Sequence, residues 1–95
     1  MTYQQLRREM TATKSDFLRG LYFAFPQGVR EAAGGVLVDD RGAQMEIRIV
    51  SLPPREIAAL RLERIEVAIR FSAGTADLQR AMLARMDRAM QRGGG

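Results

Sequence analysis

The sequence predicts an α+β domain in which helices cover one face of an antiparallel sheet, and two observations lead to this prediction. The stretch Ile65–Phe71 alternates strictly between apolar residues and polar or small ones, and Met45–Ile49 repeats the pattern. This period of two is typical of strands with one buried face. The segments before and after these strands carry apolar residues at helical spacing. Because a pair of strands alone buries too little surface to be stable, we expect the helices to cover them.

A helix is expected to begin after Thr13. Thr13 suits the N-cap position, and Asp16 places a negative charge in the first turn, where the helix dipole favours it. Pro26 and Gly28 end the helix. Gly20 inside it costs about 1 kcal/mol relative to alanine unless close packing compensates. Its apolar stripe comprises Phe17, Leu18, Leu21, Tyr22 and Phe25.

Two segments near these elements are less regular. Thr2–Met10 is predicted as a short helix, because Tyr3, Leu6 and Met10 recur at helical spacing. Val29–Ala33 is compatible with an edge strand and with a loop.

The sheet is expected to continue with a hairpin. Val36–Val38 predicts a short strand, Asp39–Gly42 a tight turn, and Ala43–Ser51 the return strand. Leu52–Pro54 then interrupts the sheet, because proline donates no hydrogen bond to a ladder. The expected sheet has three or four strands.

The segment Arg55–Leu62 has two interpretations. Either Pro54 starts a helical turn over 55–58, or a strand runs from Ala58 to Leu62. In the second interpretation a turn or bulge at Glu63–Arg64 joins this strand to the next one. We favour the strand.

A long C-terminal helix follows Gly74. Thr75 or Ser72 caps it, and Asp77 lies in its first turn. Residues 1–92 are expected to form a single domain and residues 93–95 a flexible glycine tail. The apolar stripe of the helix comprises Leu78, Met82, Leu83, Met86, Ala89 and Met90. The predicted core comprises Phe17, Leu21, Phe25, Val36, Val38, Met45, Ile47, Ile49, Ile65, Val67, Ile69, Phe71, Leu78, Met82 and Met86.

The composition excludes several chemistries. The chain has no cysteine and no histidine, so it has neither thiol catalysis nor a Ser-His-Asp triad, and it lacks the usual ligands of zinc, haem and iron–sulfur clusters. No catalytic motif is present, and we expect neither enzymatic activity nor a cofactor nor a bound metal. The first ten residues include no apolar core of a signal peptide, and no apolar run is long enough for a membrane span. We therefore expect a cytoplasmic protein without membrane contact.

The basic side chains suggest one candidate binding surface. Of 15 basic residues only Lys14 is a lysine, and the net charge is +4. Three of the arginines, Arg85, Arg88 and Arg92, lie along one flank of the last helix, at a spacing that suits phosphate contacts. The alternative is a solvated helix flank whose alkyl stems cover the core.

Three functional hypotheses follow. The first is a non-catalytic protein-interaction module that forms a homodimer through the edge or the uncovered face of its sheet. The second is a nucleic-acid-binding protein that uses the arginine ridge of the last helix. The third is an enzyme or a small-molecule-binding protein whose anionic ligand is held by Arg48, Arg55 or Arg70.

Overall fold

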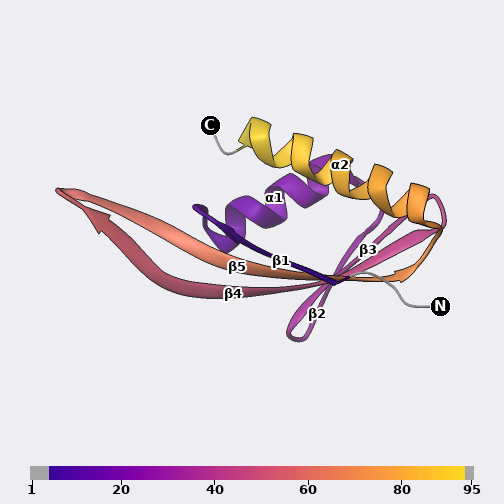
Figure 1. Ribbon diagram of the computed structural model, residues 1–95, viewed down its shortest axis with the longest axis horizontal. Helices are drawn as coiled ribbons and strands as arrows, with labels where there is room; N and C mark the ends of the chain where they lie inside the picture. Colours follow the sequence, from indigo (N-terminus) through magenta and orange to yellow (C-terminus); the bar gives the residue numbers. More distant parts are fainter. Residues whose placement is uncertain (1–4, 94–95) are drawn as a thin grey trace.

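The computed structural model describes residues 5–93, which form a five-stranded antiparallel sheet and two helices. The strands lie in the order β1-β5-β4-β3-β2. Both helices lie on the same side of the sheet (Figure 1), as the sequence predicted. In chain order the elements are β1 (Gln5–Met10), α1 (Lys14–Ala24), β2 (Val29–Ala32), β3 (Gly35–Asp40), β4 (Ala43–Ile57), β5 (Leu60–Ala73) and α2 (Ala76–Gly93).

The predicted N-terminal helix is wrong, because Gln5–Met10 is a strand. Leu6 and Met10 are four residues apart, which places them on one side of a helix and equally on one side of a strand. Pairing decides between the two, because β1 forms a register from Gln5 opposite Arg70 to Met10 opposite Ile65. The other ambiguous segment, Val29–Ala32, is the edge strand β2 and pairs with β3. The sheet therefore has more strands than the three or four expected.

The two prolines do not interrupt the sheet, contrary to the prediction. β4 continues through Pro53 and Pro54 to Ile57, and the pairing with β5 shifts by one residue between Leu52 and Arg55. A bulge of this kind tolerates proline, because the extra residue needs no ladder hydrogen bond. The chain then reverses at residues 58–59, where Ala58 has a φ of 53°. The strand favoured for this segment is present, but its turn lies before Leu60 rather than at residues 63–64.

The core lies between the sheet and the two helices. The buried apolar side chains include all of the predicted core except Ile49 and Leu78, which are partly buried. Gly20 of α1 faces Met90 of α2 so closely that an added Cβ would lie 2.7 Å from the Met90 sulfur. Gly20 therefore leaves room for the end of the Met90 side chain in the contact between the two helices.

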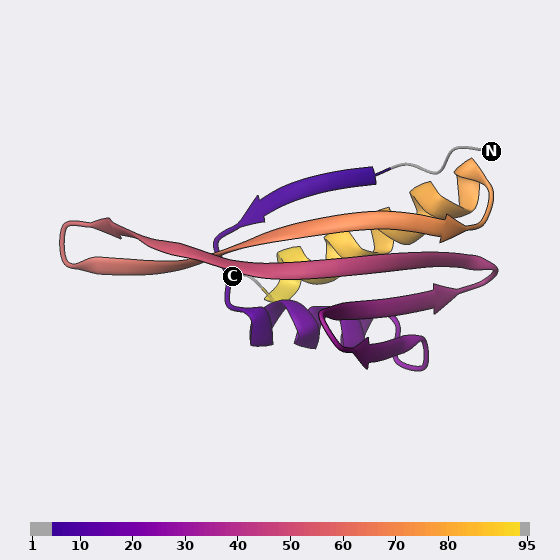
Figure 2. The same cartoon turned by 90° about the horizontal axis from the view of Figure 1, so that it is seen from below.

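The hairpin of β4 and β5 extends beyond the rest of the fold as an arm, defined here as residues 52–64. β1 pairs with β5 only from Ile65 to Arg70, and β3 pairs with β4 only from Ala43 to Ile47. The arm is therefore a two-stranded ribbon, and no helix covers it (Figures 1 and 2). Its strands cross in Figure 2, as expected from the strong twist of two-stranded ribbons. The arm contributes to the 46 Å length of the molecule, which measures 24 Å in the other two directions.

Candidate functional site

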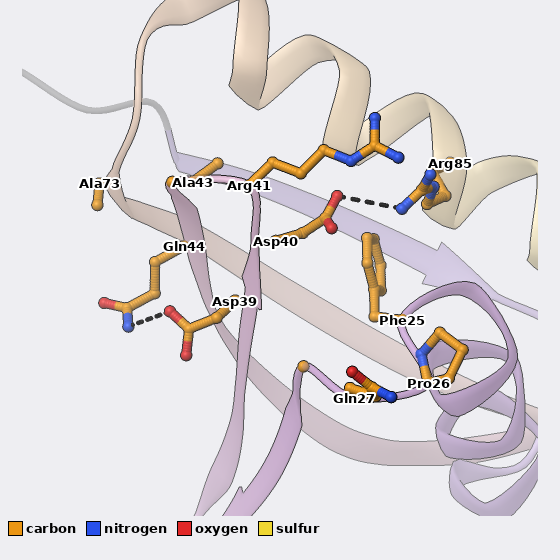
Figure 3. Close-up of a pocket in the computed structure, with 12 residues that line it drawn as sticks. Phe25, Pro26, Gln27, Asp39, Asp40, Arg41, Ala43, Gln44, Ala73 and Arg85 are labelled. Atoms are coloured by element: carbon orange, nitrogen blue, oxygen red, sulfur yellow. Dashed lines mark hydrogen bonds and ion pairs between the residues drawn. The ribbon is translucent and has the colours of Figure 1, made fainter.

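The predicted arginine ridge begins with Arg85, whose charge is balanced inside the protein. Its guanidinium donates a hydrogen bond of 3.2 Å from Nη1 to Oδ2 of Asp40 and lies 5.9 Å from the ring centre of Phe25 (Figure 3). Asp40 ends strand β3, and Phe25 follows helix α1. Arg85 thus links α2 to two other elements, and this is the behaviour of a structural arginine.

The other two members of the ridge differ from Arg85. Arg88 is exposed, and it forms no ion pair within residues 5–93. Arg92 lies in the last turn of α2, but its side chain is outside the described part of the chain. Gly94 and Gly95 of the predicted tail are outside it too, whereas Gly93 ends α2. The use of this ridge to bind nucleic acid stays a prediction, and it now depends on Arg88 and Arg92 rather than on all three side chains.

A cavity of about 530 Å³ lies beside Arg85, between the end of α1 and the β3–β4 turn (Figure 3). Four of its polar side chains are bonded in two pairs, Asp40 with Arg85 and Asp39 with Gln44. The Gln44 amide donates to Asp39 at 2.8 Å and accepts from the Ser72 hydroxyl at 2.6 Å. In the described chain no buried side-chain nitrogen or oxygen lacks a hydrogen-bond partner. The cavity therefore holds no buried polar side chain that waits for a ligand.

Acid–base catalysis without histidine or cysteine relies on a carboxylate, a tyrosine or a lysine with a suitable pKa. Tyr22 donates its hydroxyl to Glu31 at 2.7 Å, and this hydrogen bond raises the pKa of the phenol. A raised pKa moves Tyr22 further from ionisation at neutral pH, so it does not suit a general base. The residue lies at the surface, where it joins α1 to β2.

The face of the sheet without helices carries the arginines that were considered for an anion site. Arg70 forms two hydrogen bonds to Glu46, of 2.8 and 2.9 Å, across the β4–β5 pair. Arg48 lies opposite Ala68, with Arg7 on the other side of Ala68. Arg55 lies apart from them, on the arm. The structure therefore brings Arg48 and Arg70 together and adds Arg7 to them, while Glu46 already balances the charge of Arg70.

The arm exposes large apolar side chains on one of its two faces. Ile57 and Leu60 face each other at its tip and are 51% and 64% exposed. Leu62 and Leu52 share that face by register and are partly buried, and Val50, just before the arm, is 54% exposed. The opposite face is polar, with Glu56 opposite Arg61 and an ion pair between Arg61 and Glu63. The arm thus has an apolar strip, which comprises Val50, Leu52, Ile57, Leu60 and Leu62.

This apolar strip lies on the other face of the ribbon from the core residues of the same strands. In β5 the side chains of Ile65 and Val67 face the helices, whereas Leu60 and Leu62 occupy the opposite alternation. The sequence predicts a turn or bulge at Glu63–Arg64 for this change of phase between Leu62 and Ile65. β5 is continuous there and its apolar face changes side, while the shift in pairing lies on β4, between Leu52 and Arg55. The phase change itself was the signal, because a strand that continues through it must present apolar residues on both faces.

Residues 5–93 contain neither a candidate metal site nor a membrane-spanning helix. No group of three or more aspartates and glutamates lies close enough together to hold a metal ion. Neither helix is both long and apolar enough to cross a membrane.

Comparison with known proteins does not place the chain in a family. No family model matches the sequence, and no curated protein matches it. Any function must therefore be inferred from the surfaces described above.

Proposed function

We propose that this protein is a non-catalytic protein-interaction module and that the apolar strip of the β4–β5 arm is its docking surface. The observation that carries the proposal is the exposure of Ile57 and Leu60 at the tip of an arm that no other element covers. Apolar residues on a free ribbon gain stability when another surface removes them from water.

The shape of the arm supports a partner that is itself a folded protein. A two-stranded ribbon is only marginally stable alone, so contact with a partner also stabilises its backbone. The polar face, with Glu56, Arg61 and Glu63, remains suited to water while the apolar strip is covered. The two prolines at residues 53–54 disfavour strand addition along β4. The proposed contact therefore involves the side chains of the arm rather than the free edge of β4.

Site-specific photo-crosslinking in cells tests the proposal. The crosslinking amino acid p-benzoylphenylalanine replaces Leu60 or Ile57 at the tip of the arm, or Lys14 as an exposed control on α1. We expect a discrete protein adduct from positions 57 and 60 that position 14 does not produce. The mass of the adduct identifies the bound protein, including a second copy of this chain.

A second pair of variants checks that the adduct depends on the strip. Leu62→Glu places a charge within the strip and should abolish the adduct from position 60. Glu63→Gln, on the polar face of the same strand, should leave it unchanged. Equal adducts from positions 14 and 60, or no adduct at the arm, would show that the strip is not a docking surface.

A further inference from the structure

The free edge of β1 is a second surface on which an interaction can be argued from the residues. β1 is the outermost strand of the sheet, and its outer side has no partner within the described residues (Figure 2). The edge strand carries neither proline nor glycine, the residues that weaken or block pairing at sheet edges. Its backbone donors and acceptors are therefore available for an added strand.

The geometry points to a second copy of this chain as the occupant, with the two β1 strands paired antiparallel about Arg8. A two-fold axis perpendicular to the sheet keeps every side chain on its own face, so each residue faces one of the same face. In this register Arg7 faces Glu9 of the second copy on the face without helices. On the other face, Leu6 meets Met10 of the second copy. Each of these contacts occurs twice.

Charge explains why this register is preferred over its neighbours. A register centred on Arg7 brings two arginines together, and one centred on Glu9 brings two glutamates together. In the register about Arg8, the two copies of Arg8 face each other, but each already forms an ion pair with Asp87 of its own α2. Of these registers, only the one about Arg8 places arginine opposite glutamate and one apolar residue opposite another.

Arg7 supplies the second argument for β1. Within residues 5–93 it forms no ion pair, whereas Glu9 bonds to Arg64 at 2.8 Å. A carboxylate accepts several hydrogen bonds, so Glu9 retains acceptor capacity for Arg7 of the second copy. The proposed dimer thus gives Arg7 an ion-pair partner, which it lacks among the described residues of the single chain.

The edge on the opposite side of the sheet does not offer the same match. When β2 pairs with itself about a two-fold axis perpendicular to the sheet, a register centred on Arg30 or on Glu31 places like charges opposite each other. Pairing of β1 with β2 of a second copy matches Glu9 with Arg30 and Arg8 with Glu31, but it places Arg7 opposite Ala32. That arrangement also leaves a free edge at each end and grows without closing. The two-fold pairing of β1 closes after two chains.

Charge-exchange variants and light scattering coupled to size exclusion test this inference. The wild-type chain is expected to elute as a dimer. Arg7→Glu and Glu9→Arg should each shift the mass toward the monomer, because each places like charges opposite each other twice. An equimolar mixture of the two variants should recover the dimer, since every contact in the mixed pair then joins opposite charges. The control is Arg48→Glu. Arg48 lies on β4, away from the edge of β1, and has no ion pair within residues 5–93, so this variant should leave the dimer intact.

Recovery in the mixture is the decisive result, because misfolding of either variant cannot produce it. A wild-type chain that remains monomeric at 100 times the protein concentration used for the charge-exchange variants would overturn the inference. So would a mass that keeps rising with concentration, as expected for pairing of β1 with β2, or a dimer that Arg7→Glu does not weaken. Arg7→Glu leaves the arm and its bond from Arg64 to Glu9 unaltered, so the crosslinks from Leu60 in this variant report on the proposed docking surface separately.

Discussion

Arg85 and Asp40 are 45 positions apart in the sequence and lie 3.2 Å apart in the structure, between the middle of α2 and the end of β3. Their side chains are 37% and 23% exposed, so water screens the pair only in part. We expect a coupling free energy of about 1 kcal/mol from a double-mutant cycle of Arg85→Ala and Asp40→Asn, measured by urea unfolding.

A second arginine–aspartate pair in α2 provides the control for this cycle. Arg80 and Asp77 are 71% and 87% exposed, and exposed pairs contribute little. The same cycle at Arg80 and Asp77 should yield a coupling below about 0.5 kcal/mol. Equal couplings for the two pairs would contradict the view that Arg85 has a structural role.

Truncation of two isoleucines in β4 is expected to change the free energy of unfolding by different amounts. Ile47 is 1% exposed in the core, and Ile57 is 51% exposed at the tip of the arm. Ile47→Val should lower the free energy of unfolding by about 1 kcal/mol, because it removes a buried methylene group. Ile57→Val should change it by less than about 0.5 kcal/mol. Chemical unfolding of both variants checks the prediction, and a large loss from Ile57→Val would mean that the arm is packed against the body of the protein.

The arginine ridge leads to a prediction about nucleic acids. Asp40 balances the charge of Arg85, whereas Arg88 has no ion pair within residues 5–93. We therefore expect weak binding of RNA and DNA that disappears near physiological salt. Fluorescence anisotropy across a salt series measures this, with Arg88→Glu and Arg80→Glu as test and control variants. Tight binding with a steep salt dependence that Arg88→Glu abolishes would instead assign the ridge as a nucleic-acid interface.

Local patterns in the sequence were sufficient to predict the body of the fold. Thr13 accepts a hydrogen bond from the Asp16 backbone at 3.1 Å, which confirms the predicted cap. Of the two candidates for the second cap, Thr75 and Ser72, it is Thr75 that accepts a hydrogen bond from the Leu78 backbone, at 3.2 Å. The alternation that begins at Ile65 identified strand β5 and its buried face. Caps and buried faces depend on residues a few positions apart. A local sequence pattern therefore predicts them even when the contacts with distant residues are unknown.

Contacts between distant segments decided the remaining features. The spacing of Leu6 and Met10 suits a helix and a strand equally, and only the free edge of β5 made residues 5–10 a strand. The course of β4 through Pro53 and Pro54 required a bulge against β5, which no local pattern specifies. Likewise, an arginine has the same charge wherever it lies. Only the approach of Asp40 distinguished Arg85 from Arg88, which has no ion pair in the part of the chain that the structure describes. Strand pairing and ion pairing are long-range relations, and they exist only once the chain has folded.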